Sequence, residues 1–364
     1  MDDKIFQIAF TMIPRLGCRS QRQLLSMSIK PEELFKMDKA ALQEIFGTHK
    51  SIINAILEKT MMEEAEKETE FCLRNNITPL FCTDKDYPQR MNQPGCADTP
   101  VLIYRQGSCD LNPKKAVAIV GTRHATEYGK TTTQHIVEEL SSEGATIISG
   151  LAYGIDTASH KAAVEMQLPT IGVLGHGLDQ LYPPHNQELA RAMLANGALV
   201  TEYPSFTNIH PSFFPARNRI IAALCDAVIV VEASEQGGAL ITAGIAESYH
   251  RDVFAVPGRL SDTYSQGCNN LIANNKALLY RNSNDLTYIM GWNRHKKGIQ
   301  TKLFLSLSKE EQPIYDIIKE NDGLTMDELV AKMDTSIHKI AATLLSLELQ
   351  GAITCLPGKI YKVL

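Results

Sequence analysis

Four strand-like apolar runs of the sequence are each followed by a turn that contains glycine and polar side chains. These turns cover residues 121–123, 149–156, 175–177 and 237–238. Each turn leads into a helix-like stretch, and a helix N-terminus offers unpaired N–H groups and a positive dipole end to an anion. Parallel sheets bind their ligands beyond the carboxyl ends of the strands, where such turns lie side by side. The pattern predicts an anion-binding rim that is wider than one mononucleotide requires.

Arg123 lies in the first of these turns, where its guanidinium can project over the rim. A planar guanidinium forms two parallel, charge-assisted hydrogen bonds with a phosphate. The alternative is an ion pair with a nearby carboxylate such as Glu127 or Glu232. We favour the phosphate role, because the turn itself has the geometry of an anion site.

Residues 213–219 combine aromatic and basic side chains in a loop that enters a helix. Proteins that bind single strands use this combination, because aromatic faces accept any base and cations follow the backbone. Arg217 and Arg219 are two positions apart on the helix and therefore point to different faces. We expect one of them to contact phosphate and the other to brace the loop, with no preference for either assignment. The alternative for Phe213 and Phe214 is packing beneath the loop.

Other polar side chains in these turns are expected to be mainly structural. Asp156 stands at a helix start, where a carboxylate caps N–H groups, and we favour this role over ligand contact. No neighbour of His160 suggests an acid/base pair, and a histidine in this position is more often packed than a base. Glu232 is expected to be structural or to orient an arginine. Tyr182 is suited equally to stacking on a base and to packing in a core.

The elements that must position these residues divide the chain into three parts. Residues 1–70 indicate short helices joined by glycine turns and resemble a SAM-like or helix-hairpin-helix module, with a helical protein-contact domain as an equal alternative. In residues 71–290, apolar strands alternate with helices, which predicts an α/β domain with an extended Rossmann-like, doubly wound parallel sheet. A polar linker is predicted at 293–298. Residues 303–364 contain three helices and a hairpin, which predicts a winged helix.

Smaller signals predict elements on either side of this sheet domain. Residues 76–81 and 100–104 indicate two short strands in a connecting piece before the parallel sheet. Thr325 and Glu328 have the spacing of a capping box at a helix start. Residues 357–358, Pro-Gly, indicate the turn of the C-terminal hairpin.

Length and charge exclude several classes of protein. At 364 residues the chain is longer than one ordinary core, so two or three domains are expected. The net charge of −5 excludes a bulk polycation, so any nucleic-acid binding requires a local basic site. The eight cysteines are scattered without a Cys-x-x-Cys, which indicates a reduced, cytoplasmic protein without a metal site. The N-terminus lacks the features of a signal peptide, and no apolar run reaches the length of a membrane span.

Residues 79–285 resemble the DNA-processing protein A family, also called DprA or Smf. The resemblance rests on motifs that agree in order and spacing: Val-Gly-Thr-Arg-His at 120–124, Ser-Gly-Leu-Ala-Tyr-Gly-Ile-Asp at 149–156, Gly-His-Gly-Leu-Asp at 175–179, Phe-Pro-Ala-Arg-Asn-Arg at 214–219 and Gly-Gly-Ala-Leu-Ile-Thr at 237–242. Many members of the family carry a basic residue directly after a Tyr-Pro pair. In this sequence Pro184 occupies that position and His185 follows, so one phosphate contact of the family is in doubt here.

The resemblance implies a protein that binds and protects single-stranded DNA and delivers it to the recombinase RecA during natural transformation. It also implies a homodimer formed through the sheet edge near residues 253–280, and it implies no enzyme activity and no cofactor. The residues expected to bind DNA are Gly121, Arg123, Ser149, Gly150, Gly154, Gly175, Gly177, Tyr182, Asn186, Phe214, Arg217, Asn218, Arg219, Gly237, Gly238 and Thr242.

The main alternative is a Rossmann-like enzyme that hydrolyses nucleoside monophosphates. Such enzymes carry Pro-Gly-Gly-x-Gly-Thr-x-x-Glu, whereas residues 237–244 lack the second glycine-threonine step and the glutamate. Without a placed carboxylate, hydrolysis has no general acid or base. Residues 121–124 do not match the dinucleotide-binding glycine pattern, and the Gly-Lys-Thr at 129–131 lacks the upstream glycine of a P-loop.

A third class is a pure interaction module, which the C-terminal unit supports. The helix expected at residues 336–349 has only His338 and Lys339 as basic residues and also carries Glu348. A helix that reads the major groove normally brings more cationic and polar contacts. We therefore expect weak or no duplex binding by this unit and a regulatory or partner-contact role.

Overall fold

The computed structural model describes residues 2–292, 307–321, 323–333, 335–356 and 358–363. The linker predicted at 293–298 lies outside these residues, and so does Pro357 of the predicted hairpin turn. None of the described helices is both long and apolar enough to cross a membrane.

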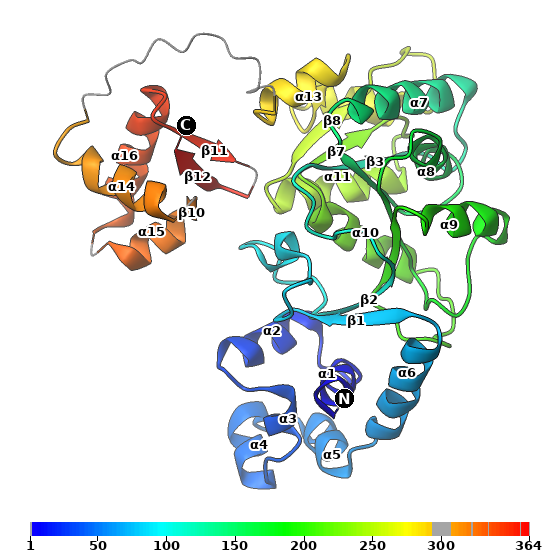
Figure 1. The fold of residues 1–364 in the computed structure, drawn as a ribbon, viewed down its shortest axis with the longest axis vertical. Helices are drawn as coiled ribbons and strands as arrows, with labels where there is room; N and C mark the ends of the chain where they lie inside the picture. Colours follow the sequence, from blue (N-terminus) through cyan, green and yellow to red (C-terminus); the bar gives the residue numbers. More distant parts are fainter. Residues whose placement is uncertain (1, 293–306, 322, 334, 357, 364) are drawn as a thin grey trace.

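A parallel sheet lies at the centre of the chain, as the apolar runs predict (Figure 1). Its order β6-β5-β4-β3-β7-β8-β9 shows that the chain winds from β3 in one direction and then returns to the other side of β3. This change of direction leaves a crevice beyond the carboxyl ends of β3 and β7, which is where open α/β sheets bind ligands. The strands are β3 (Ala116–Val120), β4 (Thr146–Ser149), β5 (Thr170–Val173), β6 (Ala198–Thr201), β7 (Ala227–Val230), β8 (Asp252–Ala255) and β9 (Leu278–Leu279).

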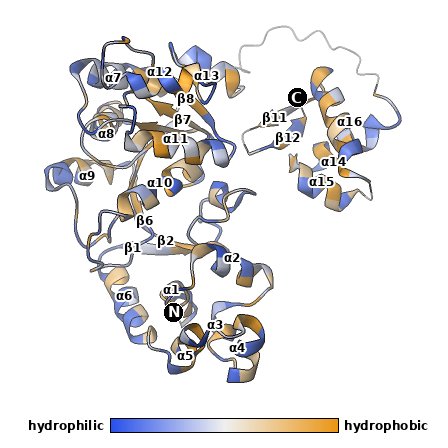
Figure 2. Ribbon diagram, turned by 180° about the vertical axis from the view of Figure 1, so that it is seen from behind, coloured by the Kyte–Doolittle hydropathy of each residue, from blue (hydrophilic) through white to orange (hydrophobic). Residues whose placement is uncertain are grey.

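Both faces of this sheet are covered by helices, because alternate residues of each strand point to opposite faces. On β3, Val117 and Ile119 belong to one apolar core, and Ala118 and Val120 belong to the other. Figure 2 shows the apolar residues of the strands between the helices. The helices of this domain are α7 (Glu127–Ser141), α8 (Ile155–Glu165), α9 (Gln187–Met193), α10 (Phe213–Leu224), α11 (Gly238–Ser248), α12 (Gln266–Ala273) and α13 (Ser283–Ile289), with short 3-10 turns η1 (Gln89–Asn92) and η2 (Pro184–Asn186).

The two short strands of the connecting piece extend the same sheet instead of standing apart. β1 (Ile77–Phe81) pairs antiparallel with β2 (Leu102–Gly107), and β2 pairs antiparallel with β6. Within the described residues the sheet therefore has nine strands, of which β2 runs against the other eight. The sequence shows both strands, but their partner lies almost a hundred residues away, which local patterns do not reveal.

The N-terminal helices share a core with β1 and β2. Phe10 and Leu42 lie in one buried cluster with Phe81 and Tyr104. The division expected at residue 70 falls inside α6, so the helical region is continuous with the sheet in both chain and core. These helices are α1 (Asp2–Thr11), α2 (Cys18–Ser26), α3 (Pro31–Leu34), α4 (Lys39–Phe46), α5 (Lys50–Glu58) and α6 (Met62–Arg74).

The C-terminal residues form a winged helix with its own apolar core, as expected. Ile318, Leu329 and Leu344 are buried together there. The capping box predicted at Thr325 is confirmed, because its side chain accepts from the Glu328 N–H while the Glu328 carboxylate accepts from the Thr325 N–H. The elements are α14 (Glu311–Glu320), β10 (Leu324–Thr325), α15 (Met326–Lys332), α16 (Ile337–Leu349), β11 (Ile353–Leu356) and β12 (Ile360–Val363).

Candidate functional site

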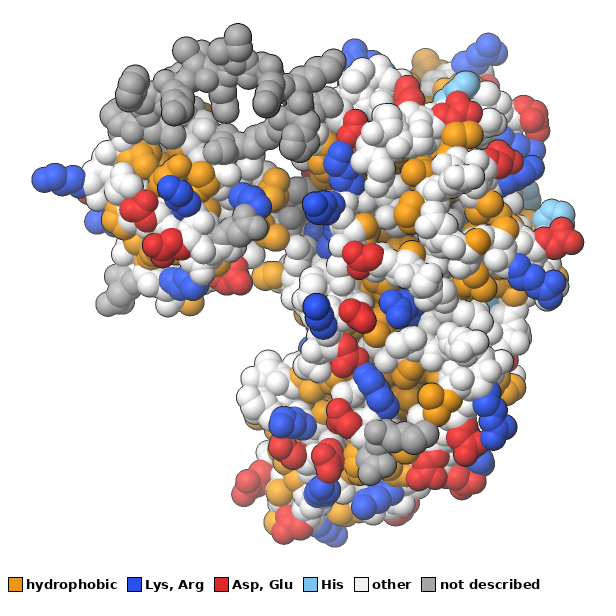
Figure 3. All heavy atoms as spheres, viewed as in Figure 1, with side chains coloured by type: hydrophobic (Ala, Val, Ile, Leu, Met, Phe, Trp, Pro, Cys, Tyr) orange, Lys and Arg blue, Asp and Glu red, His pale blue; other side chains and the backbone are white. Residues whose placement is uncertain are grey.

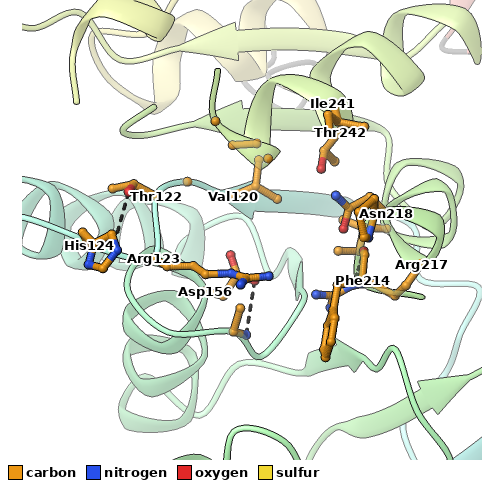
Figure 4. A pocket seen from close by; sticks show the side chains of 17 residues that line it. Val120, Thr122, Arg123, His124, Asp156, Phe214, Arg217, Asn218, Ile241 and Thr242 are labelled. Carbon is orange, nitrogen blue, oxygen red and sulfur yellow. Dashed lines mark hydrogen bonds between the residues drawn. The ribbon is translucent and has the colours of Figure 1, made fainter. Parts of the chain in front are cut away.

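A cavity of about 360 Å³ lies at the crevice between the ends of β3 and β7 (Figure 4). The turn after β3 forms one wall, the first turn of α11 forms another, and the first turns of α10 close it. Three of the four glycine turns found in the sequence thus meet at this cavity, and the turn at residues 175–177 does not line it. Eight of the residues expected to bind DNA line it: Gly121, Arg123, Phe214, Arg217, Asn218, Gly237, Gly238 and Thr242.

The exposed guanidinium of Arg123 faces the ring of Phe214, with its central carbon 5.8 Å from the ring centroid. No hydrogen bond or ion pair joins the Arg123 side chain to another described residue. Both carboxylates considered as alternatives have other partners: Glu232 accepts the Thr126 N–H at 3.0 Å, and Glu127 pairs with Lys130 at 2.7 Å. The cation of Arg123 is therefore available to a ligand.

Arg217 is buried, with 3% of its surface exposed, and its guanidinium donates to the backbone carbonyls of Gly150 and Val173. Gly150 is required by this approach, because a Cβ there would lie 2.1 Å from Nη1 of Arg217. Burial lowers the pKa of Arg217 to about 10, with a smaller contribution in the same direction from the charge of Arg123 and an opposing one from Asp156. Arg217 thus braces α10 against β4 and β5 and still lines the cavity.

Arg219 lies on another face of α10, as the spacing predicts, and pairs with Glu202 at the end of β6. Its Nη1 lies 3.2 Å from Oε1 of Glu202, and the side chain does not line the cavity. Both arginines therefore have protein partners in this structure. The expectation that one of the two arginines contacts phosphate stays a prediction. Arg217 is the better candidate, because it lines the cavity and Arg219 does not.

Two aromatic rings extend the row that begins at Arg123. The ring of Tyr182, which is 44% exposed, lies 5.5 Å from the ring of Phe214 between centroids. A second small cavity of about 20 Å³ adjoins the first, and Arg123, Tyr153, Tyr182 and Phe214 line it. Tyr182 is therefore a surface residue and not a core tyrosine. Exposed aromatic faces beside a cation can stack bases without regard to their sequence.

Phe213 differs from its neighbour Phe214, because it packs beneath the loop. Its ring stacks on Tyr203 with centroids 4.3 Å apart and an interplanar angle of 23°. Phe213 thus has the packing role that the sequence left open, and the DNA contact of Phe214 stays a prediction.

The first turn of α11 supplies the helix N-terminus that the sequence predicts. Its N-cap is Gly237, which has no side chain to bond the first N–H groups. Gly238 is exposed, and Thr242 is buried behind it at the cavity wall. N–H groups without a side-chain cap at the positive end of a helix can bind an anion, and this helix end lines the same cavity as Arg123.

Asp156 and His160 are structural, as expected. The buried carboxylate of Asp156 accepts the N–H groups of Gly150 at 3.2 Å and Ala152 at 3.3 Å, and burial raises its pKa. It therefore holds the loop that precedes α8 and does not cap the helix N-terminus as expected, because the N-cap there is Gly154 without a side-chain bond. His160 is fully buried, its Nδ1 lies 2.7 Å from Oγ1 of Thr170, and burial lowers its pKa to about 3. A histidine that stays neutral in the core has no role as a base at the rim.

The remaining expected residues support the rim without lining the main cavity. Ser149 donates to the Ile119 carbonyl, and Asn186 donates to the Leu151 carbonyl at 2.9 Å. Gly154 has a φ of +78°, and a Cβ there would lie 2.2 Å from the Thr122 carbonyl oxygen. Gly175 and Gly177 lie against the backbone of the segment that leads to α10.

Some lining residues were absent from the expected set. His124 and Ile241 line the main cavity, and the His124 ring stacks on Tyr264 at 6.4 Å between centroids. Tyr153 lines the small cavity and also a third one of about 410 Å³, which Lys161 and His185 line as well. His124 and Tyr153 lie inside the motifs that carry the resemblance, so the sequence could have identified them as candidate site residues. Tyr264 lies in the loop after β8 and gave none.

Comparison with known proteins agrees with this geometry. The sequence model of a family described as "DNA recombination-mediator protein A" matches residues 78–291, and that of the "DprA winged helix domain" matches residues 305–359. Protein Smf of Synechocystis is 30% identical over 99% of this chain and 98% of its own length.

Two solved structures share the fold. DNA processing protein A from Streptococcus pneumoniae superposes with a TM-score of 0.68 and 31% identity, covering 78% of this chain and 97% of that one. A structure from Helicobacter pylori has a TM-score of 0.53 and 30% identity over 58% of this chain and 94% of that one. Its description concerns the single-stranded DNA binding mode of DNA processing protein A.

The burial of neutral His160 predicts a pH-dependent stability. Its pKa in the fold is about 3, below the ordinary value of about 6.5, so the unfolded chain binds one more proton between these values. This contribution is complete above about pH 6.5 and is lost as the pH falls towards 3. When the pH is lowered from about 7 to about 5, the free energy of unfolding of the unsubstituted chain should decrease by about 2 kcal/mol more than that of His160→Gln. Urea denaturation at the two pH values measures this difference. Equal losses in the two proteins would contradict the assignment.

Proposed function

Because this chain belongs to the DNA-processing protein A (DprA/Smf) family, we propose that it binds single-stranded DNA without sequence preference and delivers the strand to a recombinase. The observation that carries the proposal is the row formed by Arg123, Phe214 and Tyr182 at the mouth of the cavity. Arginine neutralises a phosphate, and the two rings accept the faces of neighbouring bases. A stacking surface of this kind accepts every base, so sequence preference is not expected.

A local site is necessary because the chain as a whole carries a net charge of −5. On the face shown in Figure 3, acidic and basic side chains are interspersed, so attraction of DNA depends on particular positions. At the rim, Arg123 and Arg217 lie close enough for one to lower the pKa of the other. An anion bound between them relieves this repulsion, which favours a phosphate at that point.

The recombinase part of the proposal rests on the family. The description of the matching family as a recombination mediator supports delivery of the bound strand to a RecA-type recombinase, with natural transformation as the setting and the cytoplasm as the location. The winged helix has only His338 and Lys339 as basic residues on α16, so we propose a regulatory or partner-contact role for it instead of duplex reading.

We propose no catalytic step. Among the described residues that line the main cavity, Asp156 is the carboxylate, and it is buried and bonded to two backbone N–H groups. A group in that position is unavailable as a general acid or base for nucleotide hydrolysis. The described lining of the main cavity therefore offers no group that favours the enzyme alternative.

Arg123→Ala should weaken the binding of a single-stranded oligonucleotide about tenfold or more at moderate salt, because one charge-assisted phosphate contact is lost. The slope of log affinity against log salt should decrease by about 0.7, the contribution of one phosphate on a single strand. Fluorescence anisotropy at several salt concentrations measures both quantities, with duplex DNA as competitor.

Arg191→Ala is the matched control, because Arg191 is exposed on α9 and lines none of the three cavities. It should bind like the unsubstituted chain. Equal binding of single strand and duplex, or an Arg123→Ala variant that binds as well as Arg191→Ala, would refute the proposed site.

We also propose a homodimer formed through the β9 edge of the sheet. Leu278 and Leu279 of this edge strand are 43% and 42% exposed, and an exposed apolar edge strand is a natural self-pairing surface. Leu279→Lys should halve the mass measured by light scattering, whereas Leu73→Lys, at another exposed leucine, should leave it unchanged. A monomeric unsubstituted chain, or a Leu279→Lys dimer, would exclude this interface.

A further inference from the structure

The segment between β6 and α10, residues 202–212, leads directly to the aromatic residues of the site. It passes close to Gly177 in the loop after β5, where a Cβ would lie 2.6 Å from the Pro204 carbonyl oxygen. Its first part reaches the site through Tyr203, whose ring stacks on Phe213 next to Phe214. The position of Phe214 therefore depends on how this segment is held.

Helix α6, from the N-terminal helices, holds the middle of this segment. Glu68 is 5% exposed, and its Oε2 accepts the Ser205 N–H at 3.0 Å while Oε1 accepts the Ser205 hydroxyl at 3.1 Å. A third donor is the Cys72 thiol, at 3.6 Å from Oε1. A buried carboxylate is unfavourable unless it is hydrogen-bonded. Two of the three hydrogen bonds that Glu68 accepts come from Ser205.

A second contact between α6 and the segment lies next to the first. Phe206 has a φ of +62°, a left-handed backbone conformation that bulky side chains disfavour. Its ring is 71% exposed and meets the ring of Phe71 edge to face, with centroids 5.1 Å apart. A residue in such a conformation persists only where its surroundings hold it, which here means α6 and the Glu68 bonds.

The N-terminal helices also contact α10, which follows this segment in the chain. The thiol of Cys18 on α2 lies 3.8 Å from Nη2 of Arg219, which is itself paired with Glu202 at the start of the segment. The chain from Glu202 to Arg219 is thus tied to the N-terminal helices in two places, on either side of Phe213 and Phe214.

We propose that α6 sets the position of the Phe213–Phe214 pair and thereby the affinity of the site for single-stranded DNA, with Glu68 as the positioning residue. The inference rests on the proposed function and assigns a role to the N-terminal helices. The path runs from Glu68 through Ser205 and Tyr203 to the two phenylalanines. Because these helices share their core with β1 and β2, the test uses substitutions in the full chain instead of removal of the helices.

Glu68→Ala should weaken single-strand binding about tenfold, the size of one lost base–aromatic stack. The slope of log affinity against log salt should stay unchanged, since no phosphate contact is removed. The loss should disappear in a Phe214→Ala background, because both substitutions act on the same stack. Glu64→Ala is the matched control: Glu64 is an exposed carboxylate one turn earlier on α6, beside the same segment.

The control should bind like the unsubstituted chain, and circular dichroism verifies the fold of each variant. Ser205→Ala removes one of the bonds from a partly exposed loop residue and should give a smaller loss in the same direction, which tests the inference even where Glu68→Ala does not fold. Normal binding by both variants, or a Glu68→Ala effect that adds to that of Phe214→Ala, would overturn it. An unsubstituted chain that fails to bind single strands would instead overturn the proposed function.

Discussion

The site depends on the burial of one guanidinium. Arg217 donates to the Gly150 carbonyl at the end of β4 and to the Val173 carbonyl in β5, and so ties α10 to two strands. Hydrogen bonds from a charged donor are worth about 1.5–3 kcal/mol each, and an unpaired charge at that depth is strongly unfavourable. Gly150 is the residue that leaves room for it. With α10 held in this way, Phe214 faces Arg123 across the crevice.

The same burial sets the electrostatics of the rim. Arg217 and Arg123 are two cations, and Asp156 is the carboxylate that lies between the loop amides beneath them. Because Asp156 compensates one positive charge, the cavity retains an excess of about one cation. The open N-terminus of α11 adds a positive end to the same space. The resulting preference for an anion arises from a few placed groups in a chain whose net charge is negative.

The sequence predicts local features of this arrangement well and long-range partners poorly. The strands after residue 114 follow from the apolar periodicity, and the capping box at Thr325 follows from its spacing. The packed His160 is expected because no neighbour suggests an acid/base pair. The antiparallel addition of β1 and β2 does not, because pairing of β2 with β6 joins segments that are distant in sequence. The partner of Arg219 was equally hidden, since Glu202 reaches it only once β6 and α10 have packed.

The most direct test of the central claim is to locate the bound strand by photo-cross-linking. An oligonucleotide with a photoreactive pyrimidine would be irradiated with the full chain, and the modified residues would be identified by mass spectrometry. The account predicts cross-links at the rim, on Phe214 and Tyr182. Cross-links confined to the winged helix, with the rim unmodified, would contradict it.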